Sequence, residues 1–215
     1  TRHLSNITTM APLTGLDSQY FSIARNATSG DLHLTYYRNN GVNSQRDLMH
    51  TSFNGTNWSD PEVIDGGGAG SKWKTGQSHN GLEIDSVGGL HLSYWDWKDQ
   101  GSDQAYLKYA YYNGSSWYVQ TLQSIIGQNN PLRHTSLDID SDDRPHISYY
   151  DAMNSTLRYT YYDGSAWVDH TLTEDDSNDN GRYNSIALDS SDHPRIAYRN
   201  ETSDDLELAT WSGTE

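Results

Sequence analysis

The chain reads SLDIDSDDRPHISYY over residues 136–150 and TLRYTYYDGSAW over residues 156–167. Close variants of these two stretches occur three more times, within residues 22–58, 81–117 and 185–215. Equivalent positions recur at intervals of roughly 50 residues, which is typical of repeat architectures. The sequence therefore predicts one domain over residues 1–215, built from repeats at 18–65, 76–123, 131–173 and 180–215.

Each repeat carries the pattern of four short strands. Apolar and polar side chains alternate from Leu90 to Tyr94 and again from Leu157 to Tyr162, and this period of two indicates β-strands. The pairs Asn113-Gly114 and Asp163-Gly164 separate the third and fourth strand patterns and favour tight hairpins. Four antiparallel strands in a unit of this length predict an all-β fold, a β-propeller of four-stranded blades.

The two ends of the chain resemble the two parts of one repeat. Thr1–Leu4 is similar to the fourth-strand segment Asp169–Leu172, whereas the last repeat reaches Glu215 without a fourth strand. We therefore expect residues 1–7 to complete the last blade, which would close a four-bladed ring and remove open sheet edges. The alternative is that these blades form part of a longer array.

Composition excludes several classes of function. The net charge of −15 disfavours nucleic acid, whose binding depends on Lys and Arg. Cysteine is absent, and no apolar run approaches the roughly 18–20 residues of a membrane span. Asparagine in the glycosylation pattern points to a secreted or cell-surface glycoprotein; it occurs at Asn6, Asn26, Asn54, Asn57, Asn113, Asn154 and Asn200.

The segments Asp140–Tyr150 and Leu157–Trp167 resemble extracellular propeller repeats of the sialidase-like, bacterial-neuraminidase-repeat superfamily. Ser78–Asp85, followed by Gly89-Leu90-His91, is also similar to a repeat of some polysaccharide lyases, including ulvan-degrading ones. The resemblance implies a propeller and says little about function, because propellers host many activities. The Ser-X-Asp-X-Gly-X-X-Trp box of sialidases does not occur in this chain, and the lyases are larger, with more blades.

One face of the predicted propeller carries the candidate ligand site. The entry to the first strand and the loop between the second and third strands share this face, which we call the top face; its loops vary in length, as binding loops do. Aromatic, His, Arg and Asp side chains there suit carbohydrate. The predicted ligand-binding residues are Tyr20, His79, Trp95, Asp96, Trp97, Arg133, His134, Tyr150, Asp151, Arg182 and Tyr183. The competing interpretation is packing between blades and capping of turns.

Two further sets of residues need an interpretation. His33, His91, His146 and Arg195 lie in the middle of strands, and we interpret them as structural. A loop with alternating oxygen side chains and a glycine predicts a calcium site, with a solvated polar loop as the alternative. Its candidate ligands are Asp176, Asn178, Asn180 and Asn184. We expect no other cofactor.

These observations favour a non-catalytic binding or adhesion module, with carbohydrate or a surface protein as its partner. The first alternative is an enzyme. A polysaccharide lyase would use His79 or His134 as base, Tyr183 as acid, and Arg133 or Arg182 to neutralise the uronate. A glycosidase would need a carboxylate pair, for which Asp96 and Asp151 are the candidates. The second alternative is a structural subunit of a surface layer or filament, which would form homo-oligomers.

Overall fold

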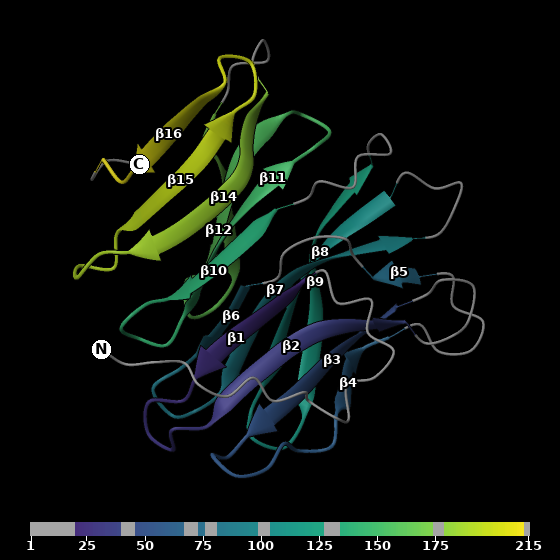
Figure 1. Ribbon diagram of the computed structural model, residues 1–215. Coiled ribbons are helices and arrows are strands. Elements are labelled where there is room, and N and C mark those ends of the chain that lie inside the picture. Colours follow the sequence, from purple (N-terminus) through teal and green to yellow (C-terminus); the bar gives the residue numbers. More distant parts are fainter. Residues whose placement is uncertain are drawn as a thin grey trace, which may run out of the picture.

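The computed structural model describes residues 20–39, 46–66, 73–75, 81–98, 104–126, 134–173 and 179–212, with the backbone alone at 73–75, 97–98 and 126. Every regular element in these ranges is a β-strand. The described residues therefore contain no helix long and apolar enough to cross a bilayer. The strands form successive antiparallel units that fan out one after another (Figure 1). The predicted all-β propeller architecture is confirmed.

Three blades have four strands each in the described part of the chain, and the last has three. Blade 1 contains β1 (Phe21–Arg25), β2 (Leu32–Asn39), β3 (Arg46–Phe53) and β4 (Glu62–Asp65). Blade 2 contains β6 (Gly81–Ile84), β7 (Leu90–Lys98), β8 (Gln104–Tyr112) and β9 (Trp117–Ile126). Blade 3 contains β10 (Thr135–Ile139), β11 (Pro145–Asp151), β12 (Thr156–Tyr162) and β13 (Trp167–Thr171). Blade 4 contains β14 (Asn180–Leu188), β15 (Pro194–Asn200) and β16 (Asp205–Thr210).

An additional short strand, β5 (Trp73–Thr75), joins the first two blades. It pairs in parallel with β3 through Arg46 and Lys74, and antiparallel with β7. Blades 1 and 2 therefore form one continuous nine-stranded sheet. The sequence does not predict this strand, because three residues are too few to show a strand period.

The hydrophobic core is divided among the junctions between blades. At the junction of blades 2 and 3, Trp95 and Leu107 of blade 2 pack with Leu137, Ile147 and Tyr149 of blade 3. Similar clusters fill the junctions on either side. Burial of these apolar side chains between neighbouring blades stabilises the stack.

The hairpin turns have the conformations that their residues predict. Gly114 has a φ of 91°, and the Asn113 side chain accepts backbone hydrogen bonds from Ser115 and Ser116, each at 3.0 Å. Asp163 and Gly164 repeat this arrangement in blade 3. Asn-Gly and Asp-Gly therefore fix the connection between the third and fourth strands.

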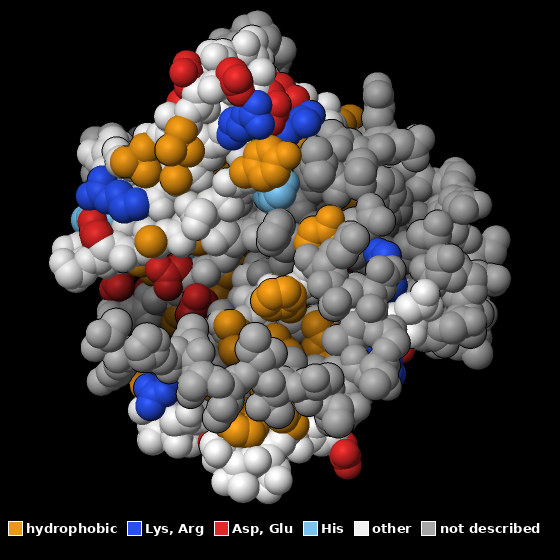
Figure 2. Space-filling view, in the orientation of Figure 1, with side chains coloured by type: hydrophobic (Ala, Val, Ile, Leu, Met, Phe, Trp, Pro, Cys, Tyr) orange, Lys and Arg blue, Asp and Glu red, His pale blue; other side chains and the backbone are white. Residues whose placement is uncertain are grey.

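The outer face of blade 4 is not covered by another described blade. Leu206 is 81% exposed and Leu208 is 63% exposed, whereas Leu157, which occupies the position of Leu206 in blade 3, is 0% exposed. Figure 2 shows apolar side chains gathered over this last blade. The predicted closing strand, residues 1–7, lies outside the described residues.

Candidate functional site: a groove between blades 2 and 3

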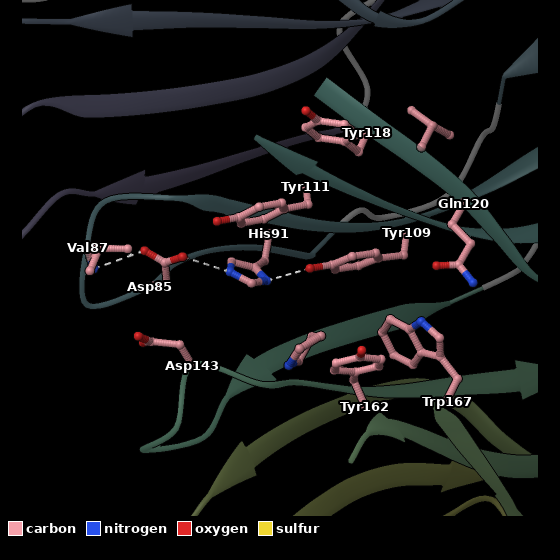
Figure 3. Close-up of a pocket in the computed structure, with 12 residues that line it drawn as sticks. Asp85, Val87, His91, Tyr109, Tyr111, Tyr118, Gln120, Asp143, Tyr162 and Trp167 are labelled. Carbon is pink, nitrogen blue, oxygen red and sulfur yellow. Dashed lines mark hydrogen bonds and ion pairs between the residues drawn. The ribbon is translucent and has the colours of Figure 1, made fainter. Parts of the chain in front are cut away.

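A cavity of about 610 Å³ opens between blades 2 and 3 (Figure 3). This volume falls within the range of small-molecule sites, roughly 300–1,000 Å³. Strands of both blades line the cavity together with the β6–β7 and β10–β11 turns, which belong to the face opposite the top. We call this cavity the blade 2–3 groove, and its lining consists of Asp85, Val87, His91, Tyr109, Tyr111, Tyr118, Val119, Gln120, Asp143, Pro145, Tyr162 and Trp167.

Cross-strand register builds the wall contributed by blade 2. His91 of β7 pairs with Tyr111 of β8, and Tyr111 pairs with Tyr118 of β9. Because directly opposed side chains share one face of a sheet, these three rings form a row. Tyr109 of β8, two residues before Tyr111, is opposed in the same way to Gln120 of β9. Tyr118 is 58% exposed, so its ring is available to a ligand.

Two aromatic residues of blade 3 form the opposite wall. Tyr162 of β12 is paired with Trp167 of β13, and their ring centres lie 5.8 Å apart. The Trp167 ring meets Tyr109 of blade 2 edge to face, with 5.1 Å between the centroids. Figure 3 shows Tyr162 and Trp167 facing the blade 2 side chains across the groove. Tyrosine and tryptophan faces therefore lie on both sides of the cavity.

A chain of hydrogen bonds runs along the floor of the groove. Asp85 Oδ2 lies 3.2 Å from His91 Nε2, and the Tyr109 hydroxyl lies 2.6 Å from His91 Nδ1 (Figure 3). Burial lowers the pKa of His91, although the hydrogen bond to Asp85 opposes this effect. A neutral imidazole that donates from Nε2 to Asp85 accepts a hydrogen bond from the Tyr109 hydroxyl at Nδ1. The chain therefore fixes the orientation of all three side chains.

The close approach of Asp85 to the backbone requires glycine at position 89. A Cβ atom there would lie 2.3 Å from Asp85 Oδ2 and 2.9 Å from the Tyr111 ring. Asp85 Oδ1 in turn accepts backbone hydrogen bonds from Val87 and Gly89, at 3.1 and 2.6 Å. Both carboxylate oxygens of Asp85 are thus engaged within blade 2.

The second carboxylate of the groove connects the two blades. Asp143 has a φ of 61° in the β10–β11 turn, which aims its side chain at blade 2. Its Oδ1 accepts from the Ser86 backbone N–H at 2.8 Å, and its Oδ2 accepts from the Ser86 hydroxyl at 2.6 Å. These hydrogen bonds hold the pKa of Asp143 below its usual value. Asp143 therefore carries a negative charge at neutral pH, at the rim of the groove.

This arrangement suits binding better than acid–base chemistry. Both carboxylates already accept hydrogen bonds, and a lowered pKa is the opposite of what a general acid needs. Among the described residues, those that line the groove include no Lys and no Arg. The groove therefore offers aromatic faces, hydrogen-bond acceptors and negative charge.

The structure brings several predicted top-face residues together near blades 3 and 4. The buried His134 ring lies 4.3 Å from the Tyr183 ring, which is 48% exposed. The Arg182 guanidinium lies 2.6 Å from Asp179 and stacks over the Tyr150 ring at 5.3 Å. The Tyr150 hydroxyl donates to the same Asp179 at 2.6 Å. These polar groups bind one another, and the top-face site stays a prediction.

The remaining predicted top-face residues are dispersed. Tyr20 packs against the junction of blades 1 and 2, and Trp95 is buried between blades 2 and 3. Asp96 pairs with Lys108 at 2.5 Å, and Asp151 caps the β11–β12 turn through the Met153 backbone N–H at 3.0 Å. Trp97 is described by its backbone alone, and His79 and Arg133 lie outside the described residues.

Half of the predicted calcium site can be placed. Asn184 is buried, accepts from the Ser148 hydroxyl at 2.8 Å and donates to the Gly181 carbonyl at 2.9 Å. Asn180 is also buried, in the first residue of β14. Asp176 and Asn178 lie outside the described residues, and the described residues contain no cluster of three or more His, Cys, Asp or Glu that could hold a metal. Calcium stays a prediction.

The sequence does not predict the groove. The repeat pattern predicts a structural role for His91, which does lie between blades but also lines the cavity. A signal was present, because His91, Tyr109 and Tyr111 recur as His146, Tyr159 and Tyr161 in the next repeat. What the sequence lacks is the separation between blades, which decides whether such side chains meet or leave a space.

No protein-family model and no curated protein matches the sequence. The structure is similar to a protein of unknown function from Dyadobacter fermentans, with a TM-score of 0.63, 13% identity, and coverage of 92% of this chain and 66% of that chain. A leech intramolecular trans-sialidase has a TM-score of 0.51 and 14% identity, over 89% of this chain and 30% of that chain. A fucose lectin from Kordia zhangzhouensis in complex with methyl-fucoside has a TM-score of 0.47 and 18% identity, over 72% and 99%. The similarity to the Dyadobacter fermentans protein and to the leech trans-sialidase supports the fold. This chain spans less than two thirds of the length of either protein.

Proposed function

We propose that this chain is a secreted or cell-surface carbohydrate-binding module and that the blade 2–3 groove holds the sugar. The observation that carries the proposal is the aromatic lining of a cavity of about 610 Å³, with polar groups at defined positions. The similar structure of an intramolecular trans-sialidase agrees with this proposal, which rests on the groove.

The chemistry of the lining fits a sugar ring. Tyr118 and Trp167 offer flat apolar surfaces, on which the C–H faces of a pyranose can stack. Asp143 and Gln120 offer acceptors and donors for hydroxyl groups. A few polar groups in a mainly aromatic pocket give orientation and specificity. An adhesion role at a cell surface follows if the sugar belongs to a surface glycan.

Binding without catalysis is the version that we favour. A lyase acting on uronates needs a cation to neutralise the carboxylate, and the part of the groove lining that the structure describes offers no Lys or Arg. A glycosidase needs a carboxyl group that still holds a proton at the working pH, whereas the lowered pKa of Asp143 favours its ionised form. A polysaccharide lyase or glycosidase-like enzyme is the first alternative, and a structural subunit of a surface layer or filament is the second.

A glycan array followed by calorimetry tests the proposal. Tyr118→Ala removes an exposed ring of the groove, and Tyr183→Ala, the matched control, removes a similarly exposed ring of the predicted top face. We expect Tyr118→Ala to weaken binding about tenfold, the equivalent of roughly 1.4 kcal/mol. Tyr183→Ala should leave binding unchanged.

Other outcomes would separate the alternatives. The reverse pattern would move the site to the top face. Depolymerisation of a bound glycan, followed by the appearance of unsaturated or reducing ends, would show an enzyme. No binding across the array, combined with concentration-dependent light scattering, would favour the structural subunit.

A further inference from the structure

The blade 2–3 groove combines two features that need not occur together in a sugar site. Aromatic side chains line both of its walls, and among the described lining residues only Asp85 and Asp143 carry carboxylates, while none carries an ammonium or guanidinium group. The basic residue nearest in sequence to Asp143, Arg144, is paired with Asp142 at 3.1 Å. The charge of the groove is therefore negative and is not balanced by the residues that line it.

We infer that the groove selects glycans with unmodified amino groups, such as glucosamine polymers, over N-acetylated and anionic glycans. This inference rests on the proposed function and names the class of sugar that the same groove takes. Protonated amines carry the positive charge that both features of the groove favour.

The aromatic walls favour a cation through their ring faces. An ammonium group within about 6 Å of a Trp or Tyr ring is attracted by the negative face of the ring, and more strongly when water is excluded. Tyr111 and Tyr118 belong to one wall and Tyr162 and Trp167 to the other, so an amino group between them can meet more than one ring. An N-acetyl group has no charge and loses this attraction.

The carboxylates favour the same cation through their charge. Asp143 stays ionised because two hydrogen bonds from Ser86 stabilise its charged form. Each of its oxygens has a second lone pair for a ligand. A uronate or sialate would instead face like charge, in a chain whose net charge is −15.

The repeat supplies a matched control. Asp192 of blade 4 occupies the position of Asp143 and accepts the same two hydrogen bonds from Ser141, at 3.1 and 2.6 Å. Asp143→Asn removes the negative charge at the rim of the groove. Asp192→Asn makes the same chemical change at the next junction, so any effect on folding should be similar in the two variants.

Calorimetry on the whole chain, at mildly acidic pH, would compare glucosamine oligomers with N-acetylglucosamine oligomers and uronate oligomers of equal length. We expect the amine-bearing oligomer to bind about fivefold or more tightly than the acetylated one, with added salt weakening only the former. Asp143→Asn should remove most of this preference, and Asp192→Asn should keep it.

Two results would overturn the inference: equal or tighter binding of the acetylated or uronate oligomer, or equal loss of preference in both variants. The proposed function fails separately. If neutral oligomers bind and Tyr118→Ala weakens them, the groove is a sugar site without a preference for amines. If no oligomer binds, both proposals fail.

Discussion

Ser86 in the β6–β7 turn donates two hydrogen bonds, from its backbone N–H and its hydroxyl, to the carboxylate of Asp143 in the β10–β11 turn. Ser141 and Asp192 make the same pair between blades 3 and 4. The pair is lacking between blades 1 and 2, where Ala27 replaces the serine and Gly88 the aspartate. A serine–aspartate latch therefore ties together the blades that border the groove.

The hydrogen bonds of this latch predict that the free energy of unfolding depends on pH. Its hydrogen bonds lower the pKa of Asp143 and of Asp192, so its stabilisation is fully present above the ordinary carboxyl pKa and is lost as pH falls through the lowered values. The double variant Ser86→Ala, Ser141→Ala should be less stable than the parent near pH 7, and the difference should shrink towards about pH 3. Urea unfolding at several pH values measures this, and a pH-independent difference would contradict the prediction.

The junction cores predict a contrast between two repeat-equivalent leucines. Leu107 of blade 2 is 0% exposed, whereas Leu206 of blade 4 is 81% exposed. Leu107→Ala should reduce the free energy of unfolding by about 3 kcal/mol, because it removes apolar contacts and leaves a cavity. Leu206→Ala should change it by less than about 0.5 kcal/mol. Equal losses in chemical denaturation would mean that the outer face of blade 4 is covered in solution.

The buried imidazoles predict a shared titration behaviour. Burial lowers the pKa of His91 and of His146, and the hydrogen bonds to Asp85 and Asp140 only oppose this effect. Both should titrate below the ordinary value of about 6.5 in NMR spectra. The unfolded chain binds protons more readily at these positions, so their contribution to stability is complete above about pH 6.5 and declines as pH falls. Midpoints at or above 6.5 would show that the rings are not buried as described.

The sequence predicts the fold well because a blade is a local object. Alternation from Leu90 to Tyr94 fixes which side chains face a neighbouring blade, and Asn113-Gly114 fixes the hairpin. These signals lie within a few residues of one another and return in every repeat. The short strand β5 gives no such signal, because its pairing depends on two blades meeting.

The candidate site depends on distances between blades, which no local pattern encodes. Gly181 illustrates this, because it lies between the predicted calcium ligands Asn180 and Asn184, and yet a Cβ atom there would lie 2.6 Å from the backbone of Leu157 in blade 3. The close approach of the two blades and a φ of 107° account for the glycine without a metal. The groove was missed for the same reason, since its two walls are contributed by different repeats.

A buried ion cluster in blade 2 gives the last prediction. Lys108 Nζ lies 2.7 Å from Asp65 of blade 1 and 2.5 Å from Asp96. Burial alone would lower the pKa of Lys108, but Asp96 and Asp65 raise it above its usual value. The lysine is thus charged, and its ammonium group pairs with both carboxylates at the junction of blades 1 and 2.

Lys108→Met should reduce the free energy of unfolding by an amount on the order of 3 kcal/mol, because it leaves Asp96 buried beside Asp65 without their cation. Adding Asp96→Asn to this variant should restore part of the loss, since it removes the uncompensated buried charge and keeps the shape of the side chain. Lys108→Arg keeps the charge and should lose less than Lys108→Met. Denaturant unfolding of the three variants measures the series, and a double variant no more stable than Lys108→Met would show that packing of the lysine stem, rather than its charge, holds the junction.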